Sequence, residues 1–300
     1  MKIAIVTPTH NRSDFLKKLY LSLLNQNKRE SITWIVIDDG SNDNTEMIVK
    51  NMKDENLISI EYTYQKNSGK AAALNLAFKT YNFFDFFLVV DSDDHLLENV
   101  FNSIETEIRH YENKLNVGAI FFRYMDSNNK ILSSNNDHKN KTVIMKRSDH
   151  DSKYGKYDGC VGYYKRVISK YSYPVFYGEK YMGPTVIQLL MEDDFEIVFS
   201  NKVVGVAEYQ DKGLTKSGRL LRIKNPLGMK LYSWLIIEKS DSNIIKLKYA
   251  IAYNMYVNFI NYFYFDKNKK TEKNIYTIST VPFGFLLYLY YKNKYKDLLK

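Results

Sequence analysis

The stretch Phe86-Phe87-Leu88-Val89-Val90-Asp91-Ser92-Asp93-Asp94 decides the fold of this chain. Its apolar residues are typical of a buried strand, and the acids behind them stand where open α/β sheets bind ligands, at the carboxyl end of a strand. Two carboxylates one residue apart can share a divalent cation with a diphosphate, because Mg²⁺ and Mn²⁺ prefer carboxylate, phosphate and water oxygens. An isolated Asp-x-Asp is more often a solvated acidic turn, so the neighbouring sequence has to decide.

Segments around this stretch alternate between strand-like and helix-like patterns over residues 1–115. Strands are predicted at four places: residues 2–7, 34–37, 57–64 and 86–90. A helix is predicted after each of the first three strands, and the third helix covers residues 70–80. Such alternation is typical of a mostly parallel sheet flanked by helices. The sequence therefore predicts an α/β fold.

Polar clusters follow three of the predicted strands: Pro8-Thr9-His10-Asn11, Asp38-Asp39-Gly40-Ser41 and Asp91-Ser92-Asp93-Asp94. Because the carboxyl ends of parallel strands meet at one edge of a sheet, we expect the three clusters to converge. Lys70, at the start of its helix, would add positive potential for a phosphate. On the residues alone, Lys70 can equally be a surface lysine and His10 a loop imidazole bonded to the backbone.

Two common phosphate-binding motifs are absent from the sequence. No Gly-x-Gly-x-x-Gly follows the first strand, and no Gly-x-x-x-x-Gly-Lys-Ser/Thr occurs. Their absence argues against a dinucleotide dehydrogenase and a P-loop NTPase. A phosphate must therefore be held in another way.

The first half of the chain resembles family 2 glycosyltransferases, which have the GT-A fold. Pro8-Thr9-His10-Asn11 is similar to the turn that ends the first strand in that family, and Asp38-Asp39-Gly40-Ser41 is its Asp-Asp-Gly-Ser motif. Asn67-Ser68-Gly69-Lys70-Ala71-Ala72-Ala73-Leu74-Asn75 matches a variant of its third signature, and Asp91-x-Asp93 matches its metal motif. Four signatures in the right order make the resemblance specific.

The resemblance implies a nucleotide diphosphate sugar as donor, with UDP as the expected nucleotide. It implies that Asp39 reads the uracil edge, that Asp38 supports the same loop, and that Lys70 lies near the diphosphate. It places Asp91 toward the ribose and Asp93 on a Mn²⁺ or Mg²⁺ ion. The other residues implied in donor binding are Pro8, His10, Asn11, Asn67 and Ser92.

Residues 116–215 are then expected to bind the acceptor, with strands at 117–124 and 142–145 and an exposed loop at 126–141. Some related bacterial transferases carry Gly-Glu-Lys-Phe-x-Pro-Glu and, later, Glu-Tyr-x-x-Asp-Gly-Leu-Thr. This chain has Gly178-Glu179-Lys180-Tyr181-Met182-Gly183-Pro184 and then Glu208-Tyr209-Gln210-Asp211-Lys212-Gly213-Leu214-Thr215.

The general base is the one conspicuous departure from the family pattern. The usual acid that opens the helix is replaced by Pro184, followed by Thr185, and a proline cannot accept a proton. An inverting transfer needs a carboxylate within hydrogen-bond reach of the acceptor hydroxyl, and Glu179 is the first candidate. Glu179 can instead be a structural ion-pair or helix-start acid. The acids at 192–194 follow the helix and are expected at the far edge.

The bulk composition fits one α/β core with an appendage, since the chain has 300 residues, 45% apolar and 26% charged. The opening residues lack the basic start, long apolar stretch and cleavage site of a signal peptide, so a cytoplasmic protein is expected. The single cysteine, Cys160, agrees with that compartment and is expected to be a buried apolar residue.

Residues 216–300 form a basic, aromatic-rich part that is expected to be a helical appendage. They carry 16 Lys and Arg against 5 Asp and Glu, whereas residues 1–215 carry 27 against 29, so the net charges are +11 and −2. Two uncharged runs, 249–265 and 275–291, are at the short limit for crossing a bilayer, and Pro282 interrupts the second.

The polar stripe of Asn254, Asn258 and Asn261 predicts that residues 249–265 form an amphipathic helix, which suits the surface of an anionic membrane. Peripheral binding to the inner face of the plasma membrane is therefore one prediction. A helical cap on the catalytic domain or a dimer interface in a homo-oligomer is the alternative. Nucleic acid is disfavoured as a partner, because no RNP-like or zinc-knuckle pattern occurs.

The sequence thus predicts three parts: a donor-binding half over 1–115, an acceptor-binding half over 116–215 and the appendage over 216–300. The predicted function is a metal-dependent inverting glycosyltransferase that transfers a sugar to a glycan or lipid-linked acceptor in bacterial surface polysaccharide synthesis. Because of Pro184, a non-catalytic subunit that binds nucleotide sugars or assists assembly is the rival hypothesis.

Overall fold

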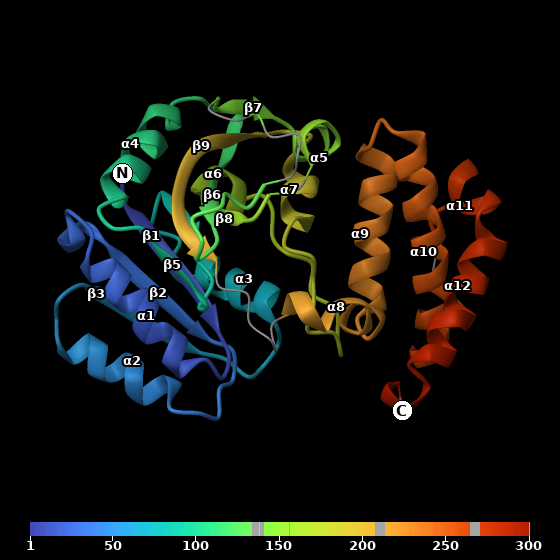
Figure 1. The fold of residues 1–300 in the computed structure, drawn as a ribbon, viewed down its shortest axis with the longest axis horizontal. Helices are drawn as coiled ribbons and strands as arrows, with labels where there is room; N and C mark the ends of the chain where they lie inside the picture. The colour runs from blue at the N-terminus through green and yellow to red at the C-terminus, as the bar shows by residue number, and fades with distance from the viewer. Residues whose placement is uncertain (134–137, 139–140, 156, 208–213, 265–270, 300) are drawn as a thin grey trace. The chain divides into compact units, whose positions relative to one another are not determined.

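A computed structural model describes residues 1–300 except 134–137, 139–140, 156, 208–213, 265–270 and 300 (Figure 1). The chain divides into two compact units. Met1–Tyr173 and Met191–Gln210 form the sheet unit, and Pro174–Leu190 and Asp211–Lys300 form the helical unit. The segment 174–190, which the sequence assigns to the acceptor-binding half, thus belongs to the same unit as the basic C-terminal part.

Four parallel strands build the first half of the sheet, in the order β3-β2-β1-β4. The strands are β1 (Ile3–Thr9), β2 (Thr33–Asp38), β3 (Ser59–Tyr64) and β4 (Phe86–Val89). The helices between them are α1 (Ser13–Leu24), α2 (Thr45–Asp54) and α3 (Lys70–Thr80), with a short 3-10 turn, η1 (Arg29–Ser31). The predicted alternation of strands and helices is confirmed here, and α3 covers the predicted residues.

Beyond β4 the same sheet becomes mixed, in the order β4-β8-β6-β9-β5, with β7 paired to β9. β8 runs antiparallel to both of its neighbours, whereas β6 and β9 run parallel. The strands are β5 (Asp94–Leu96), β6 (Val117–Met125), β7 (Val143–Met145), β8 (Gly159–Tyr164) and β9 (Glu196–Ala207). The helices are α4 (Phe101–Tyr111), α5 (Arg147–Tyr154) and α6 (Lys165–Ile168). The sheet is thus parallel in the predicted donor half and mixed in the rest.

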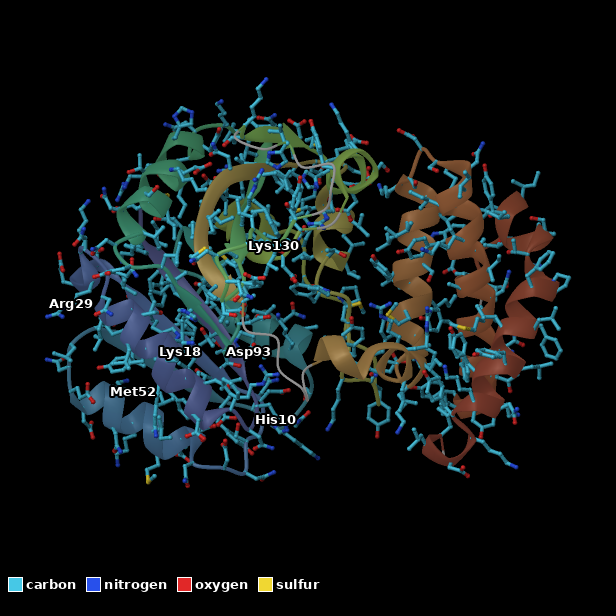
Figure 2. The ribbon with its side chains drawn as sticks, viewed as in Figure 1. His10, Lys18, Arg29, Met52, Asp93 and Lys130 are labelled. Carbon is cyan, nitrogen blue, oxygen red and sulfur yellow. The ribbon has the colours of Figure 1, made fainter. Side chains whose placement is uncertain are left out.

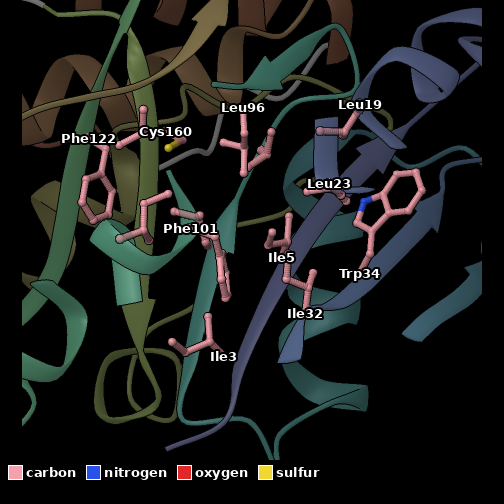
Figure 3. Close-up of a cluster of buried hydrophobic side chains, with 14 of the residues drawn as sticks. Ile3, Ile5, Leu19, Leu23, Ile32, Trp34, Leu96, Phe101, Phe122 and Cys160 are labelled. Carbon is pink, nitrogen blue, oxygen red and sulfur yellow. The ribbon is translucent and has the colours of Figure 1, made fainter. Parts of the chain in front are cut away.

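Alternate residues of the central strands pack on opposite faces of the sheet. Ile5 and Trp34 belong to the same buried cluster as Leu19 and Leu23 of α1 (Figure 3). Phe87 of β4 points to the other face, where its ring meets that of Phe78 on α3, with centroids 5.4 Å apart. Right-handed crossovers place α1 and α2 on one face and α3 on the other, because the strand order reverses after β3.

Cys160 lies on β8 within the first of these clusters (Figure 3). The thiol is buried, and burial raises its pKa to about 12. A thiol in this setting stays protonated and behaves as a small apolar side chain. The structure therefore agrees with the role expected for it.

The helical unit is arranged around one long helix, α10, which packs against α9, α11 and α12 (Figure 1). Its elements are α7 (Val186–Met191, the last residue of which belongs to the sheet unit), α8 (Leu214–Ile223), α9 (Pro226–Lys239), α10 (Asn243–Tyr264), α11 (Ile275–Ser279), α12 (Val281–Lys294) and η2 (Lys296–Leu298). The largest side chains buried along α10 are Tyr253, Tyr256 and Phe259. The C-terminal part is therefore helical, as predicted.

The asparagine stripe predicted on residues 249–265 lies on α10 and is covered over part of its length. Asn254 is only 8% exposed, and its side-chain amide donates to the carbonyl oxygen of Thr277 at 2.8 Å and to Thr280 Oγ1 at 3.0 Å. Asn258 is half-buried, and its amide donates to the carbonyl oxygen of Asn254 at 2.8 Å, whereas Asn261 is exposed. Residues at the end of α11 and just before α12 therefore cover the part of this stripe around Asn254.

Within the described ranges, no helix combines the length and the apolar character that crossing a membrane requires.

Candidate functional site

The ends of β1 and β2 bring the first two polar clusters together. The two strands pair in register, with Pro8 opposite Ile37 and Thr9 opposite Asp38, and the amide of Asp39 donates to the carbonyl oxygen of Thr9 at 2.8 Å. β4 pairs with the other side of β1, which places the acidic loop on the same edge. The predicted convergence of the three clusters is therefore found in the structure.

Asn11 joins the loop after β1 to the loop after β2. Its backbone is in the left-handed region, with φ at 52°, and its amide donates to Ser41 Oγ at 2.9 Å. Its side-chain oxygen accepts from the amide of Asn42 at 2.7 Å. Beside it, the ring of His10 (labelled in Figure 2) lies with Nε2 2.9 Å from the side-chain amide of Asn67. Asn11, His10 and Asn67 thus lie at one junction.

Asp38 is buried and holds the loop that follows β2. One carboxylate oxygen accepts from the amide of Ser41 at 2.8 Å, and the other accepts from the Tyr62 hydroxyl at 2.7 Å. Burial, together with this carboxylate, raises the pKa of Tyr62 above its ordinary value, so the hydroxyl stays a donor. Asp38 therefore connects the loop after β2 to Tyr62 of β3.

Asp39 connects the same loop to the start of α3. It is 5% exposed, and its carboxylate accepts from Gln65 Nε2 at 2.6 Å and from the amides of Ser68 and Gly69 at 2.7 and 2.8 Å. A carboxylate offers about four acceptor positions, so about one remains for a ligand. Next to it, Gly40 has φ at 78°, and a Cβ there would lie 2.6 Å from the amide nitrogen of Asn67, which a larger residue could not tolerate.

Lys70 is the first residue of α3 and lies against the acidic loop. Its Nζ is 2.5 and 2.6 Å from the two carboxylate oxygens of Asp91. Burial alone would lower the pKa of Lys70, but the charges of Asp91, Asp94 and Asp93 outweigh it and raise that pKa. Lys70 therefore stays protonated at the amino end of a helix, where an anion is favoured.

The remaining residues of the acidic loop are partly or fully buried. Asp93 (Figure 2) pairs with the guanidinium of Arg12, and Ser92 is buried between the two outer acids. Asp94 opens β5, where burial and the charges of Asp91 and Asp93 raise its pKa to about 8. Asp94 therefore keeps its proton at neutral pH, and Lys70 and Arg12 balance the charges of Asp91 and Asp93.

Asp91 and Asp93 are the side chains here that could hold a divalent cation. Next to them, burial is the main cause of the raised pKa of Asp94, and the charges of Asp91 and Asp93 add to it. Among the described residues, no group of three or more His, Cys, Asp or Glu side chains is placed to bind a metal. A site with two acidic ligands fits Mg²⁺ or Mn²⁺, since phosphate and water can supply the other ligands.

Three residues of this site were not predicted from the sequence: Arg12, Tyr62 and Gln65. Arg12 follows the turn at Asn11, but a lone arginine beside a loop carries no recognisable pattern. Tyr62 lies inside a strand with only partial alternation, and Gln65 follows that strand directly. Polar clusters follow β1, β2 and β4, so the polar Gln65 directly after β3 was the one signal in the sequence that pointed to this site.

Glu179 lies in the helical unit and caps α9. Its two carboxylate oxygens accept from the amides of Leu227 and Gly228 at 2.6 and 2.8 Å, in the first turn of that helix. The Tyr264 hydroxyl lies 3.4 Å away, and burial and Glu179 raise the pKa of Tyr264 to about 12. Both oxygens are thus engaged in holding the helix, which is the structural role left open for this residue by the sequence.

The other acids considered for the acceptor side have structural partners. Glu192 is buried and accepts from the amide and the hydroxyl of Ser148, both at 3.1 Å, and Asp194 pairs with Lys170 at the surface. Pro184 and Thr185 precede α7, as expected for a helix start. Most of the stretch 208–215 falls outside the described residues, as does part of the expected loop 126–141.

The family model that matches this chain is glycosyl transferase family 2, over residues 4–172. An uncharacterized glycosyltransferase of Mycoplasma genitalium is 27% identical over 135 residues, which are 44% of this chain and 44% of that protein. Glycosyltransferase GlyA of Streptococcus pneumoniae serotype 4 is 29% identical over 122 residues, 40% of this chain and 17% of that protein. The chain therefore spans less than half the length of these two relatives.

Solved structures with the same fold cover most of the chain. S. aureus TarS 1–349 in complex with UDP-GlcNAc has a TM-score of 0.62 at 18% identity, over 93% of this chain and 79% of that one. Mannosyltransferase PcManGT from Pyrobaculum calidifontis, in complex with GDP-Man and Mn²⁺, has a TM-score of 0.59 at 13% identity, over 98% of this chain and 87% of that one. Because the family model covers more than half of it, this chain belongs to glycosyl transferase family 2 and has the GT-A fold.

Proposed function

We propose that this protein transfers a sugar from a nucleotide diphosphate donor, expected to be a UDP-sugar, to a glycan or lipid-linked acceptor in bacterial surface polysaccharide synthesis. The observation that carries the proposal is the junction at the sheet edge, where Asp39 bonds the start of α3 and Lys70 of that helix bonds Asp91. Side chains suited to bind a base, a phosphate and a metal ion thus lie together at one edge of the sheet. The nucleotide-sugar complexes of TarS and PcManGT support it by fold alone.

At the donor end we assign each role by chemistry. The acceptor position left on Asp39 suits an N–H of a pyrimidine base, and the nearby ring of His10 offers a face for stacking. Lys70, protonated at the amino end of α3, suits the diphosphate. Asp93, with Asp91, would hold Mn²⁺ or Mg²⁺, and the ion would neutralise charge on the diphosphate leaving group. We propose residues 1–115 as the donor-binding half and 116–215 as the acceptor-binding half.

Inversion at the sugar carbon requires a base for the acceptor hydroxyl. Glu179 was the candidate from the sequence, but two backbone amides already occupy its oxygens. A carboxylate in that state gains little from accepting a proton, because hydrogen bonds to the charged form favour that form. We therefore propose that Glu179 stabilises α9 and that another group takes the proton.

Pro184 and the capping role of Glu179 together favour a second candidate function, a subunit that binds nucleotide sugars without turnover. Incubating the purified protein with a panel of UDP-sugars, and with glycan and lipid-linked acceptors, separates the two. Release of UDP that depends on an acceptor supports the transferase. Saturable UDP-sugar binding without such release supports the binding subunit.

The metal assignment is tested with Asp93→Asn, which removes one charge and keeps the shape. We expect UDP affinity in the presence of Mn²⁺ to fall by about tenfold or more, because one metal ligand is lost. Titration calorimetry with and without Mn²⁺ measures this. Asp14→Asn, at an exposed position on α1, is the matched control and should bind like the parent. Unchanged metal-dependent affinity in Asp93→Asn would show that Asp93 does not bind the ion.

A further inference from the structure

Helices α11 and α12 leave a broad apolar surface open on the helical unit. The exposed apolar side chains are Ile275 and Ile278 on α11 and Val281, Pro282, Phe283, Phe285, Leu286, Leu289 and Tyr290 on α12. The exposed fraction is 76% for Ile275, 62% for Leu286 and 58% for Phe283. We call this set the α11–α12 apolar face.

The face is continuous along α12. Positions 282, 285, 286 and 289 recur at intervals of three and four, so their side chains share one side of the helix. Gly284 and Tyr288 are buried on another side, where α12 packs against α10. Positions 282, 285, 286 and 289 lie on the opposite, exposed side of α12. A helix that only faced water on that side would carry polar residues there.

Leaving these side chains in water is costly for the free protein. Complete burial of one Leu or Phe side chain is worth about 1.5–3 kcal/mol. Large contiguous apolar patches are rare on soluble monomers and mark places where proteins contact a partner or a membrane. The face on α12 therefore supplies binding free energy to whatever covers it.

Lysines lie at the end of this face. Lys292 and Lys294 are in the last turn of α12, and Lys296 follows in η2. The Nζ of Lys292 lies 4.5 Å from the ring centroid of Tyr262, and that of Lys294 lies 5.9 Å from the ring of Tyr290. In both contacts the charged ammonium lies over an aromatic ring, as in a cation–π interaction. Residues 216–300 carry a net charge of +11 in all.

We infer that the α11–α12 apolar face docks on an anionic lipid surface. Its apolar side chains would lie in the headgroup boundary, and the lysines at positions 292, 294 and 296 would contact acidic headgroups. Apolar residues on one side of a helix with flanking lysines are the composition that such a boundary selects. The inference does not depend on the proposed transfer reaction, and it assigns the lipid contact to α11 and α12 instead of the predicted helix over 249–265.

A second copy of the chain fits this surface less well. A two-fold dimer would bring the same face of both copies together, and with it two regions that each carry a net charge of +11. Like charges on both sides oppose such an association. An anionic surface has the opposite charge and needs no shape complementarity to a single helix face.

The test compares vesicle binding of the full-length protein with that of two variants. Leu286→Glu combined with Leu289→Glu puts two carboxylates on the α11–α12 apolar face. Leu115→Glu, 77% exposed in the sheet unit, is the matched control. Vesicles of phosphatidylglycerol with phosphatidylcholine, and of phosphatidylcholine alone, are floated with each protein. We expect the parent and the control to bind the anionic vesicles alike and the double variant to bind about tenfold more weakly or worse.

The other outcomes overturn the proposal. These are equal binding by all three proteins, or no binding of the parent to anionic vesicles. Analytical ultracentrifugation identifies a second copy as the occupant if the parent is dimeric, the double variant is monomeric and neither binds vesicles. Circular dichroism checks that the double variant is folded. If it is not, Lys292→Gln with Lys294→Gln serves instead, and binding unchanged by that pair and by added salt rejects the lipid contact.

Discussion

Lys70 and Arg12 are the two cations that neutralise the acidic loop after β4. Each pairs with one carboxylate, Lys70 with Asp91 and Arg12 with Asp93, and Asp94 keeps its proton because its pKa is raised to about 8. Asp91 is 40% exposed and Asp93 19%, so water screens both pairs, but the loss of either cation would leave a carboxylate among like charges. The loop therefore depends on both cations for its present arrangement.

Replacing Lys70 with methionine removes the cation at the start of α3 while keeping much of its length. We expect the affinity for UDP to fall by about tenfold or more, because a charge-assisted contact to phosphate contributes about 1.5–3 kcal/mol. Titration calorimetry measures the change. Lys79→Met, in the exposed last turn of the same helix, should bind UDP like the parent. Equal affinities of the two variants would remove Lys70 from the donor site.

His150 on α5 makes stability depend on pH. Its ring is fully buried and stacks on Phe199, with centroids 3.6 Å apart, and burial lowers its pKa to about 4 against the opposing charge of Asp151. In the unfolded chain the imidazole of His150 gains a proton as the pH falls through about 6.5, whereas in the folded chain it gains one only near pH 4. Stability is therefore expected to fall as pH drops from 6.5 toward 4, by about 3 kcal/mol in total for this group.

Urea denaturation at pH 7 and pH 5 tests this titration. His150→Phe keeps a ring on Phe199 and should reduce the loss of stability between the two pH values. His110→Phe, on the exposed side of α4, is the control and should leave that loss unchanged. The assignment to His150 is rejected if both variants show the loss of the parent.

The helices and strands differ in how well the sequence reveals them. α3 and the first four strands were predicted because apolar runs and polar ends repeat there in order. β8 was not, since Gly159 and Gly162 dilute its strand pattern. Glycine is required at position 162 because β8 passes close to β4 there. A Cβ on Gly162 would lie 2.1 Å from the ring of Phe86 on that neighbouring strand. A pattern of residue types cannot report such a close approach between strands that are distant in sequence.

The same reason limits the prediction of side-chain roles. The acids and Lys70 of the proposed donor site could be singled out from the sequence because they stand directly at strand and helix ends. Whether Asn254 of α10 faces water depends on α11 and α12, and whether Glu179 is available depends on α9. Helical spacing shows that one side of a helix is polar, but it does not show which segment covers that side.

The contact of Glu179 with α9 leads to a prediction about that helix. In Glu179→Gln one acceptor oxygen becomes an amide that faces the N–H of Leu227 or Gly228. The helical unit should lose about 1–2 kcal/mol of stability, since a buried donor stays unsatisfied. Thermal unfolding by circular dichroism measures it, with Glu238→Gln on the exposed side of α9 as control. Normal stability with lost turnover would instead identify Glu179 as the base.

The two compact units contain one tryptophan each. Trp34 is buried in the sheet unit, and Trp234 lies on α9 of the helical unit, 6.0 Å from the ring of Tyr253. The fluorescence of each tryptophan therefore reports on one unit. Removing either residue leaves a probe for the other unit without a foreign label.

Trp34→Phe and Trp234→Phe make it possible to follow the units separately in urea. We expect UDP with Mn²⁺ to stabilise the transition seen in Trp234→Phe, by about 2.7 kcal/mol at a hundredfold excess over the dissociation constant. The transition seen in Trp34→Phe should not move, because its remaining probe lies in the unit without the proposed donor residues. Equal shifts in both variants would mean that the chain unfolds as one cooperative unit.

The buried thiol of Cys160 has a practical consequence. It is the only cysteine in the sequence, and its raised pKa together with its burial makes it unreactive toward maleimides in the folded protein. A cysteine introduced at Leu286 or at the exposed Tyr177 would then be the single thiol open to labelling. Spin labels or environment-sensitive dyes can therefore be attached at chosen points of the parent sequence, with no native residue removed first.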